Sequence, residues 1–278
     1  MQINADTLFL AGSMSHCLLR QQIGRPISSL PISGRCCILE GWKERLEIAG
    51  VSGRRDLLIS AESENPLSYW NRAEGAFEVF VDQRQHRGVA GVIRDTIHDV
   101  TGLTATDTPI LVVEATSNPA VDITSLMTTH VERGSSITFG MDADEKYAGC
   151  LVMEREILDL VPPLGFFDLK EQLVSAARES GAGLAAAEIV RKSIRIHSLQ
   201  EWRRGVREWS LIHSNASRND HSESSIIDTR SQVDGATIID SIVMENAIVG
   251  EGSIIARSAI GPNAIVAPGI RVIDSVYV

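Results

Sequence analysis

Apolar and polar residues recur with two different periods along the chain, and the period changes near residue 220. Before that point, short apolar runs bounded by small residues are typical of strands, and apolar residues spaced three and four apart are typical of helices. The expected strands cover residues 6–12, 55–60, 76–82 and 108–116. The expected helices cover residues 37–50, 88–100, 122–134, 166–181 and 198–213.

Strands that alternate with helices in this way predict an α/β layered fold with a mostly parallel sheet. The helix at 122–134 has the clearest boundaries, because Asp122 can cap its start and Gly134 can end it. Ligands of such sheets bind beyond the carboxyl ends of the strands. Gly12 and the segment 114–116 are expected at that edge.

From residue 226 onward, an aliphatic residue recurs every six positions. Counting from Ile242, the series is Ile248, Ile254, Ile260, Val266, Val272 and Val278, with small or turn-forming residues between. This period predicts a hexapeptide-repeat, left-handed parallel β-helix over 226–278 with the series pointing inward. The polar stretch 214–225 is expected to be a surface linker, which leaves 1–213 as the α/β domain.

Charge and cysteine usage narrow the classes of partner. The chain has 26 Lys and Arg against 36 Asp and Glu, a net charge of −10, which disfavours binding to nucleic acid or to an anionic membrane. No apolar run reaches the length of a membrane span, and the N-terminus lacks the basic segment of a signal peptide, so we expect a cytoplasmic protein. The four cysteines lack metal-ligand spacing and are expected to be reduced thiols.

Four segments, in order, resemble those of the sugar-1-phosphate nucleotidyltransferases, the NDP-sugar pyrophosphorylases. "LAGSMSHCL" and "RPISSLPI" resemble the family's L-A-G-G-x-G-T-R-L and P-K-P-L-L-P-V, and "HRGVAGVIRD" is similar to R-G-T-A-G-A-L-R. Residues 110–139 resemble its strand–helix–strand unit, and "YAGCLVMEREIL" and "FFDLKEQLV" its closing elements. The resemblance implies a Rossmann-like three-layer domain of the nucleotide-diphospho-sugar transferase type. Such a domain joins a nucleoside triphosphate to a sugar phosphate.

The first motif departs from the family at the residues that handle phosphate. Ser13 and Ser15 replace glycines whose backbone N–H groups approach the phosphates, and a side chain there re-aims the loop. His16 and Cys17 replace a Thr-Arg pair, so the guanidinium that would neutralise the transferring phosphoryl group is lost.

Other expected charges are missing as well. The motif's lysine falls on Ile27, its strand-end metal aspartate on Thr116, and its later metal aspartate near 197–198. Losing one such group costs roughly 3 kcal/mol, so two losses slow phosphoryl transfer about 10⁴-fold. We therefore expect no catalytic residue, metal site or cofactor, and a chain that acts as a nucleotide- or sugar-phosphate-binding, regulatory or scaffold subunit.

If a ligand is retained, the resemblance places it at the two glycine-containing turns. The candidate binding residues are Gly12, Ser13, His16, Arg87, Gly88 and Gly91. For His16 the alternative is an exposed loop histidine without a carboxylate partner, and for Arg87 and Arg94 it is a solvated helix face.

Two further functions stay open. An active pyrophosphorylase with a rebuilt site would use Mg²⁺ and would draw on Glu114, His16 and Arg25 as replacements. A hexapeptide acyltransferase ranks last, because such enzymes use a histidine base and no histidine follows His221. Trp202 and Trp209, two helical turns apart, are expected to pack between domains.

The repeats also predict assembly. Three-sided coils offer flat faces suited to packing about a symmetry axis, and the six-residue pattern runs to Val278 without a polar cap. We therefore expect a homo-oligomer, dimer to tetramer, held chiefly through residues 226–278.

Overall fold

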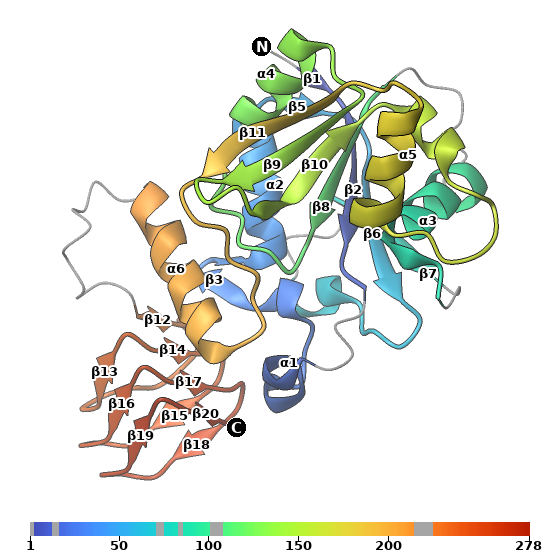
Figure 1. Cartoon of the computed structure of the whole chain (residues 1–278). Helices are drawn as coiled ribbons and strands as arrows, with labels where there is room; N and C mark the ends of the chain where they lie inside the picture. The colour runs from blue at the N-terminus through green and yellow to red at the C-terminus, as the bar shows by residue number, and fades with distance from the viewer. Residues whose placement is uncertain (1–2, 13–16, 71–74, 83–85, 101–107, 214–224) are drawn as a thin grey trace.

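A computed structural model describes residues 3–12, 17–70, 75–82, 86–100, 108–213 and 225–278, with no side chains described at 99–100 (Figure 1). The fold is mixed α/β, with a central sheet of seven strands in the order β11-β9-β10-β8-β2-β6-β7. These strands are β2 (Asp6–Leu10), β6 (Arg55–Ser60), β7 (Glu78–Asp82), β8 (Ile110–Glu114), β9 (Ile137–Asp142), β10 (Tyr147–Met153) and β11 (Leu184–Val190).

The sheet is mixed because β10 runs against its neighbours. β2, β6, β7 and β8 pair in parallel, and β11 is parallel to β9, whereas β10 is antiparallel to both β8 and β9. The four strands expected from the sequence are all present. The expectation of a mostly parallel sheet is confirmed for the strands that surround β2.

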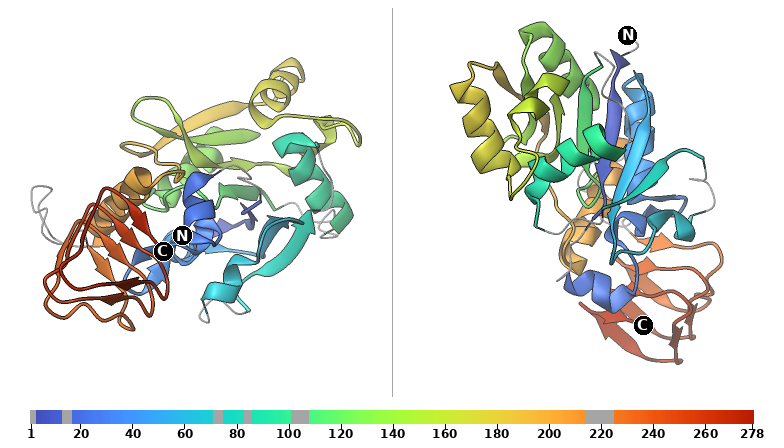
Figure 2. Two further views of the ribbon diagram at one scale, coloured as in Figure 1. Left: turned by 90° about the horizontal axis from the view of Figure 1, so that it is seen from below. Right: turned by 90° about the vertical axis from the view of Figure 1, so that its right-hand side faces the viewer.

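Helices cover both faces of this sheet (Figures 1 and 2). Adjacent residues of β2 belong to the two different hydrophobic clusters on these faces. Phe9 packs into a cluster with α2 (Ile38–Ile48), α4 (Ile123–Arg133) and α6 (Leu199–His213). Leu8 packs into the opposite cluster with α3 (Gly88–Asp95) and α5 (Val174–Glu179). This alternation is the two-residue period of a strand buried on both faces.

The expected helices form, with differences at their ends. In α4, Asp122 Oδ1 accepts from Ser125 N at 3.2 Å and Gly134 ends the helix with a φ of 55°, as predicted. The segment expected to be helical over 88–100 continues from α3 into a π-helical turn, Thr96–Val100. The one expected over 166–181 is helical only from a π-helical turn, Leu169–Leu173, through α5.

Short elements complete the first 213 residues. The helix α1 (Leu18–Ile23) and the small strands β1 (Ile3–Asn4), β3 (Pro31–Ser33), β4 (Cys36–Cys37) and β5 (Val51–Ser52) surround the central sheet. Among the described residues, 3₁₀ turns cover Ile27–Ser29, Pro66–Tyr69 and Arg155–Leu160. No helix in the described ranges is long and apolar enough to cross a membrane.

Residues 226–278 form three small parallel sheets, β12-β14-β17-β20, β13-β16-β19 and β15-β18. Their strands are β12 (Ile226–Ile227), β13 (Thr237–Ile239), β14 (Ile242–Val243), β15 (Ile248–Val249), β16 (Ile254–Ala256), β17 (Ala259–Ile260), β18 (Ile265–Val266), β19 (Arg271–Ile273) and β20 (Val276–Tyr277). Buried serines link successive turns of the chain: Ser258 N donates to Ser241 Oγ at 3.1 Å, and Ser275 N donates to Ser258 Oγ at 3.2 Å, each pair 17 residues apart.

The 17-residue spacing corrects the predicted inward series. A turn of 17 is one residue shorter than three sixes, and a one-residue slip moves a strand side chain to the other face. Ile260, Val266 and Val272 point inward as predicted, but Ile248 is 40% exposed and Val278 68% exposed. The interior is completed instead by Val243, Val249 and Ile255.

The C-terminal sheets pack directly against the first 213 residues. Ile242, Met244 and Ala259 belong to the same hydrophobic cluster as β2 and α6, so Ile242 is buried outside the coil rather than within it. Trp202 of α6 donates its Nε1–H to the Pro31 carbonyl at 2.8 Å. Trp202 and Trp209 are therefore packing residues, as expected. Of the expected linker 214–225, only Ser225 lies within the described residues.

Candidate functional site

The order of strands reverses at β2. The chain proceeds from β2 outward through β6 and β7 on one side, and then returns to place β8 on the other side of β2. In α/β sheets such a reversal leaves a crevice at the carboxyl ends of the strands, and ligands bind there. At this edge, Ala11 follows β2, Ser60 is the last residue of β6, and Thr116 lies two residues after β8.

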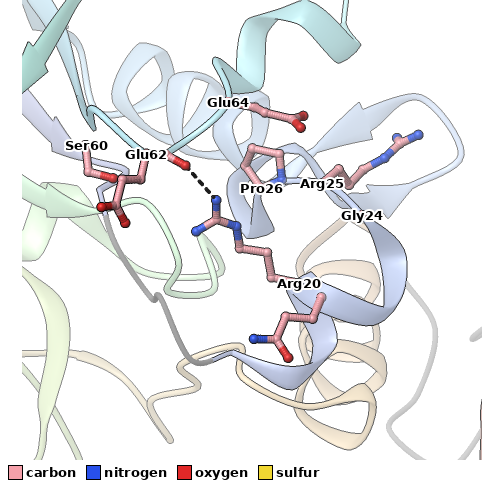
Figure 3. A pocket seen from close by; sticks show the side chains of 8 residues that line it. Arg20, Gly24, Arg25, Pro26, Ser60, Glu62 and Glu64 are labelled. Atoms are coloured by element: carbon pink, nitrogen blue, oxygen red, sulfur yellow. Dashed lines mark hydrogen bonds between the residues drawn. The ribbon is translucent and has the colours of Figure 1, made fainter.

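A cleft lies at this edge (Figure 3). Its outer part has a volume of about 310 Å³ and is lined by Arg20, Gln21, Gly24, Arg25, Pro26, Ser60, Glu62 and Glu64. An adjoining inner part shares Arg20 and Pro26 and is also lined by Ala11, Ile27, Ser28, Ser63 and Thr116. We call these two parts together the sheet-edge cleft.

Arg20 carries the positive charge that faces this cleft. It lies in the last turn of α1, which ends at Gly24 with a φ of 75°. Its guanidinium makes one long contact, 3.4 Å, to the carbonyl oxygen of Glu62, and no carboxylate of the described residues pairs with it (Figure 3). Arg20 is therefore a cation with hydrogen-bonding capacity left for a ligand.

Arg25 lines the same cleft, but its charge is already neutralised. The side chain is 5% exposed, forms an ion pair with Glu245 of the C-terminal part, and lies 4.6 Å from the centre of the Tyr69 ring. The Tyr69 hydroxyl donates to Glu64, and burial together with this carboxylate raises the pKa of Tyr69 to about 12. Arg25 thus links two parts of the molecule and is not free to replace a lost catalytic cation.

The positions that the resemblance aligns with charged groups of the nucleotidyltransferases lie inside the protein or are uncharged. The Cys17 thiol is buried and donates to the carbonyl oxygen of His197 at 3.4 Å. Ile27 is 3% exposed and packs in the core. Thr116 lines the inner cleft, and its carbonyl accepts from Ile196 N at 3.0 Å, so the structure does bring 196–197 beside the end of β8.

Glu114, the acid nearest the end of β8, pairs with Arg195. The guanidinium of Arg195 therefore neutralises the Glu114 carboxylate. This pair lies at the edge where the resemblance would place metal-binding aspartates. His197, two residues on, is partly buried, and that burial lowers its pKa. No group of three His, Cys, Asp or Glu side chains that could hold a metal ion occurs in the described part of the chain.

Arg87, Gly88 and Gly91 lie away from the sheet-edge cleft and form a closed turn. Arg87 is buried, and its Nε and Nη2 donate to the Asp95 carboxylate at 2.6 and 3.0 Å. Gly88 has a φ of 71°, and a Cβ on it would lie 2.5 Å from the Phe167 carbonyl oxygen. Gly91 N–H donates to the same oxygen at 3.2 Å.

These contacts correct the sequence interpretation of that turn. The glycines allow residue Phe167 to approach rather than a phosphate, and Asp95 neutralises the guanidinium of Arg87. The alternative of a solvated helix face is also wrong for Arg87, because its side chain is only 7% exposed.

The other candidate turn is at the cleft. Gly12 follows β2 beside Ser60, and a Cβ on it would lie 3.4 Å from Ser60 N. Ser13 and His16 lie outside the described residues. The sequence analysis did not identify Arg20 as a candidate binding residue. Its position as the basic residue near the end of a short helix that follows the motif could have indicated it.

A scan against models of known protein families finds no match for the chain, and a search of curated proteins finds none either.

Proposed function

We propose that this protein is a catalytically degenerate relative of the sugar-1-phosphate nucleotidyltransferases that binds a nucleotide or sugar phosphate in the sheet-edge cleft. The observation that carries the proposal is Arg20, a cation that has no carboxylate partner among the described residues and faces a cleft at the reversal of strand order. Phosphate oxygens are the ligands that a guanidinium at such an edge is suited to bind.

The architecture supports this assignment. The proposed fold is a Rossmann-like, nucleotide-diphospho-sugar transferase-like domain with helices on both faces of its sheet, followed by a left-handed parallel β-helix. Parallel pairing of β2 with both β6 and β8 supports the first part. The three parallel C-terminal sheets, in which linked positions lie 17 residues apart in the sequence, support the β-helix.

The charges of the cleft support a binding role over a catalytic one. Transfer of a phosphoryl group needs several positive charges that act together on the transferred group. Of the two arginines that line the cleft, Arg25 is engaged by Glu245, and Glu62 and Glu64 add negative charge. The active-enzyme alternative loses Arg25 to this pairing and Glu114 to Arg195.

Titration calorimetry with a nucleoside triphosphate and with a sugar 1-phosphate tests the binding. Arg20→Gln is expected to weaken binding roughly 10- to 100-fold, because one charge-assisted hydrogen-bonding group is lost. Arg133→Gln, an exposed arginine in the last turn of α4, is the matched control and should leave affinity unchanged. Equal affinity of the wild type and the Arg20 variant would show that the ligand does not bind in this cleft.

The proposed loss of catalytic activity is tested by a separate assay. Incubation with nucleoside triphosphates, common sugar 1-phosphates and Mg²⁺ is expected to release no diphosphate above the uncatalysed background. Cys17, Ile27 and Thr116 replace groups that stabilise the transition state, and each loss costs about 3 kcal/mol. Turnover at an ordinary enzymatic rate that Glu114→Ala abolishes would establish the active-enzyme alternative instead.

We further propose that the chain assembles with copies of itself through the β15–β18 sheet. Ile248 and Ile265 are paired neighbours on this sheet, and they are 40% and 66% exposed. Adjacent exposed aliphatic side chains on a flat parallel sheet are a surface that a second copy can cover.

A further inference from the structure

A second cleft lies between α6 and the C-terminal sheets, and arginine dominates its lining. Its volume is about 530 Å³, and its walls are formed by Leu199, Gln200, Arg203, Arg204, Arg207, Arg257 and Asp274. Three of the arginines are contributed by α6 and the fourth by the turn after β16. We call this the arginine cleft. It is separate from the sheet-edge cleft and shares no lining residue with it.

Acidic residues neutralise only part of this charge. Asp240 pairs with both Arg203 and Arg207, the latter at 3.1 Å, and Asp274 pairs with Arg257 at 2.6 Å. Four guanidinium groups therefore meet two carboxylates, which leaves a net charge of +2. The cleft therefore carries a local positive charge, although the whole chain has a net charge of −10.

Two guanidinium groups of the cleft have donors without acceptors. Arg204 is half-buried and has neither an ion pair nor a hydrogen bond from its side chain among the described residues. The Nε–H of Arg207 is shielded from solvent and has no hydrogen-bond partner among those residues either. A shielded charged donor without an acceptor is costly, and the open donors of Arg204 belong to a residue that lines the cleft, where an anion can accept from them.

From this geometry we infer that the arginine cleft is a binding site for a small phosphate-bearing molecule. A phosphate dianion matches the net charge of +2, and its oxygens accept from the planar fork of a guanidinium. The carboxylates of Asp240 and Asp274 beside these arginines repel an extended polyanion, so the ligand is a single phosphate or a phosphomonoester rather than nucleic acid. A bound phosphate joins α6 to the C-terminal sheets.

Calorimetric titration of the full chain tests this site with inorganic phosphate and with glycerol phosphate, each against chloride at equal ionic strength. Saturable binding of both is expected, and tighter binding of glycerol phosphate would identify a phosphomonoester as the ligand. Arg204→Gln should lower the affinity by roughly tenfold through loss of one charge-assisted donor group. Because the Arg204 side chain has no ion pair or hydrogen bond among the described residues, this variant should keep the melting temperature of the wild type.

Two controls separate this site from the sheet-edge cleft and from a general charge effect. Arg178→Gln removes an exposed arginine on α5, and Arg20→Gln removes the cation of the other cleft. Both should leave phosphate affinity at the arginine cleft unchanged. Failure of nucleotide binding at the sheet-edge cleft therefore leaves this result intact.

Asp274→Asn gives a change of the opposite sign. Removing this carboxylate raises the net charge of the cleft from +2 to +3 and should tighten phosphate binding several-fold, an effect that damage to the fold cannot imitate. Absence of phosphate binding above the chloride control would overturn the inference. So would unchanged affinity in Arg204→Gln, equal loss in Arg20→Gln, or stronger binding of an oligonucleotide than of the phosphomonoester.

Discussion

At the scale of single residues, Asp142 shows how one carboxylate organises a turn. From its position in the run Asp142–Lys146, the sequence predicts a solvated charged turn, and this is wrong for Asp142, which is 2% exposed. Its Oδ1 accepts from Asp144 N and Lys146 N at 3.0 and 2.9 Å. Its Oδ2 accepts from Ser193 N and Oγ at 2.9 and 2.7 Å.

These bonds predict a specific dependence of stability on pH. Burial alone raises the pKa of Asp142, but the hydrogen bonds from Ser193, Lys146 and Asp144 outweigh it and lower the pKa to about 2. A carboxylate with a depressed folded-state pKa stabilises the fold above its unfolded pKa of about 4. This contribution should be lost as the pH falls from about 4 towards about 2, as measured by urea unfolding.

Asp142→Asn isolates the contribution. Both carboxylate oxygens accept from a backbone N–H, so the amide nitrogen deprives a buried donor of its acceptor in either orientation, at a cost of about 1–3 kcal/mol. The variant should also lose less stability than the wild type between about pH 4 and about pH 2. Asp144→Asn is the control, because that side chain is 60% exposed and only faces Lys146 at 3.8 Å. Equal effects of both substitutions would mean that the hydrogen-bonded turn is not the cause.

At the scale of elements, the turn length of the C-terminal sheets decides which side chains are buried. Ile255 is fully buried within the sheets, whereas Ile273, also an aliphatic residue of a short strand, is 49% exposed. Ile255→Ala should therefore cost about 2–5 kcal/mol of unfolding free energy, and Ile273→Ala about 0.5 kcal/mol or less. Chemical denaturation of the two variants measures the difference. Equal losses would contradict the burial that the 17-residue spacing gives these two positions.

At the scale of the whole molecule, the two parts share one hydrophobic cluster, which includes Trp202 and Ile242. Arg25 and Glu245 add an ion pair across the same boundary. The β15–β18 sheet is separate from the sheet that contains Ile242, and its residues Ile248 and Ile265 are exposed. For this reason we propose it as the assembly surface.

The proposed assembly predicts a homo-oligomer in light scattering at micromolar concentration. The pair Ile248→Lys and Ile265→Lys should dissociate it, because charged side chains resist burial in an apolar contact. The pair Ile239→Lys and Ile273→Lys, on the β13–β19 sheet, is the control and should leave the oligomer intact. A monomeric wild type would refute this assembly, and dissociation by the control pair alone would move it to the other sheet.

The sequence by itself determined the elements that depend on local physics. Short continuous apolar runs identified β2 and β6, and Asp122 and Gly134 marked the ends of α4, because apolar runs and capping involve only neighbouring residues. The repeated small and aliphatic residues identified the C-terminal strands. Gly12 was placed correctly just after the end of β2, since a strand end follows directly from the strand.

Only the tertiary structure decided which distant residues meet. Arg87 and Arg25 read as available cations in the sequence, but folding brings them to Asp95 and Glu245, and a paired buried guanidinium is no longer free for a ligand. Arg20 and Arg204, by contrast, meet no carboxylate among the described residues. Pairing across long sequence separations depends on the packing of whole elements, so no local pattern of charge could have distinguished the engaged arginines from the free ones.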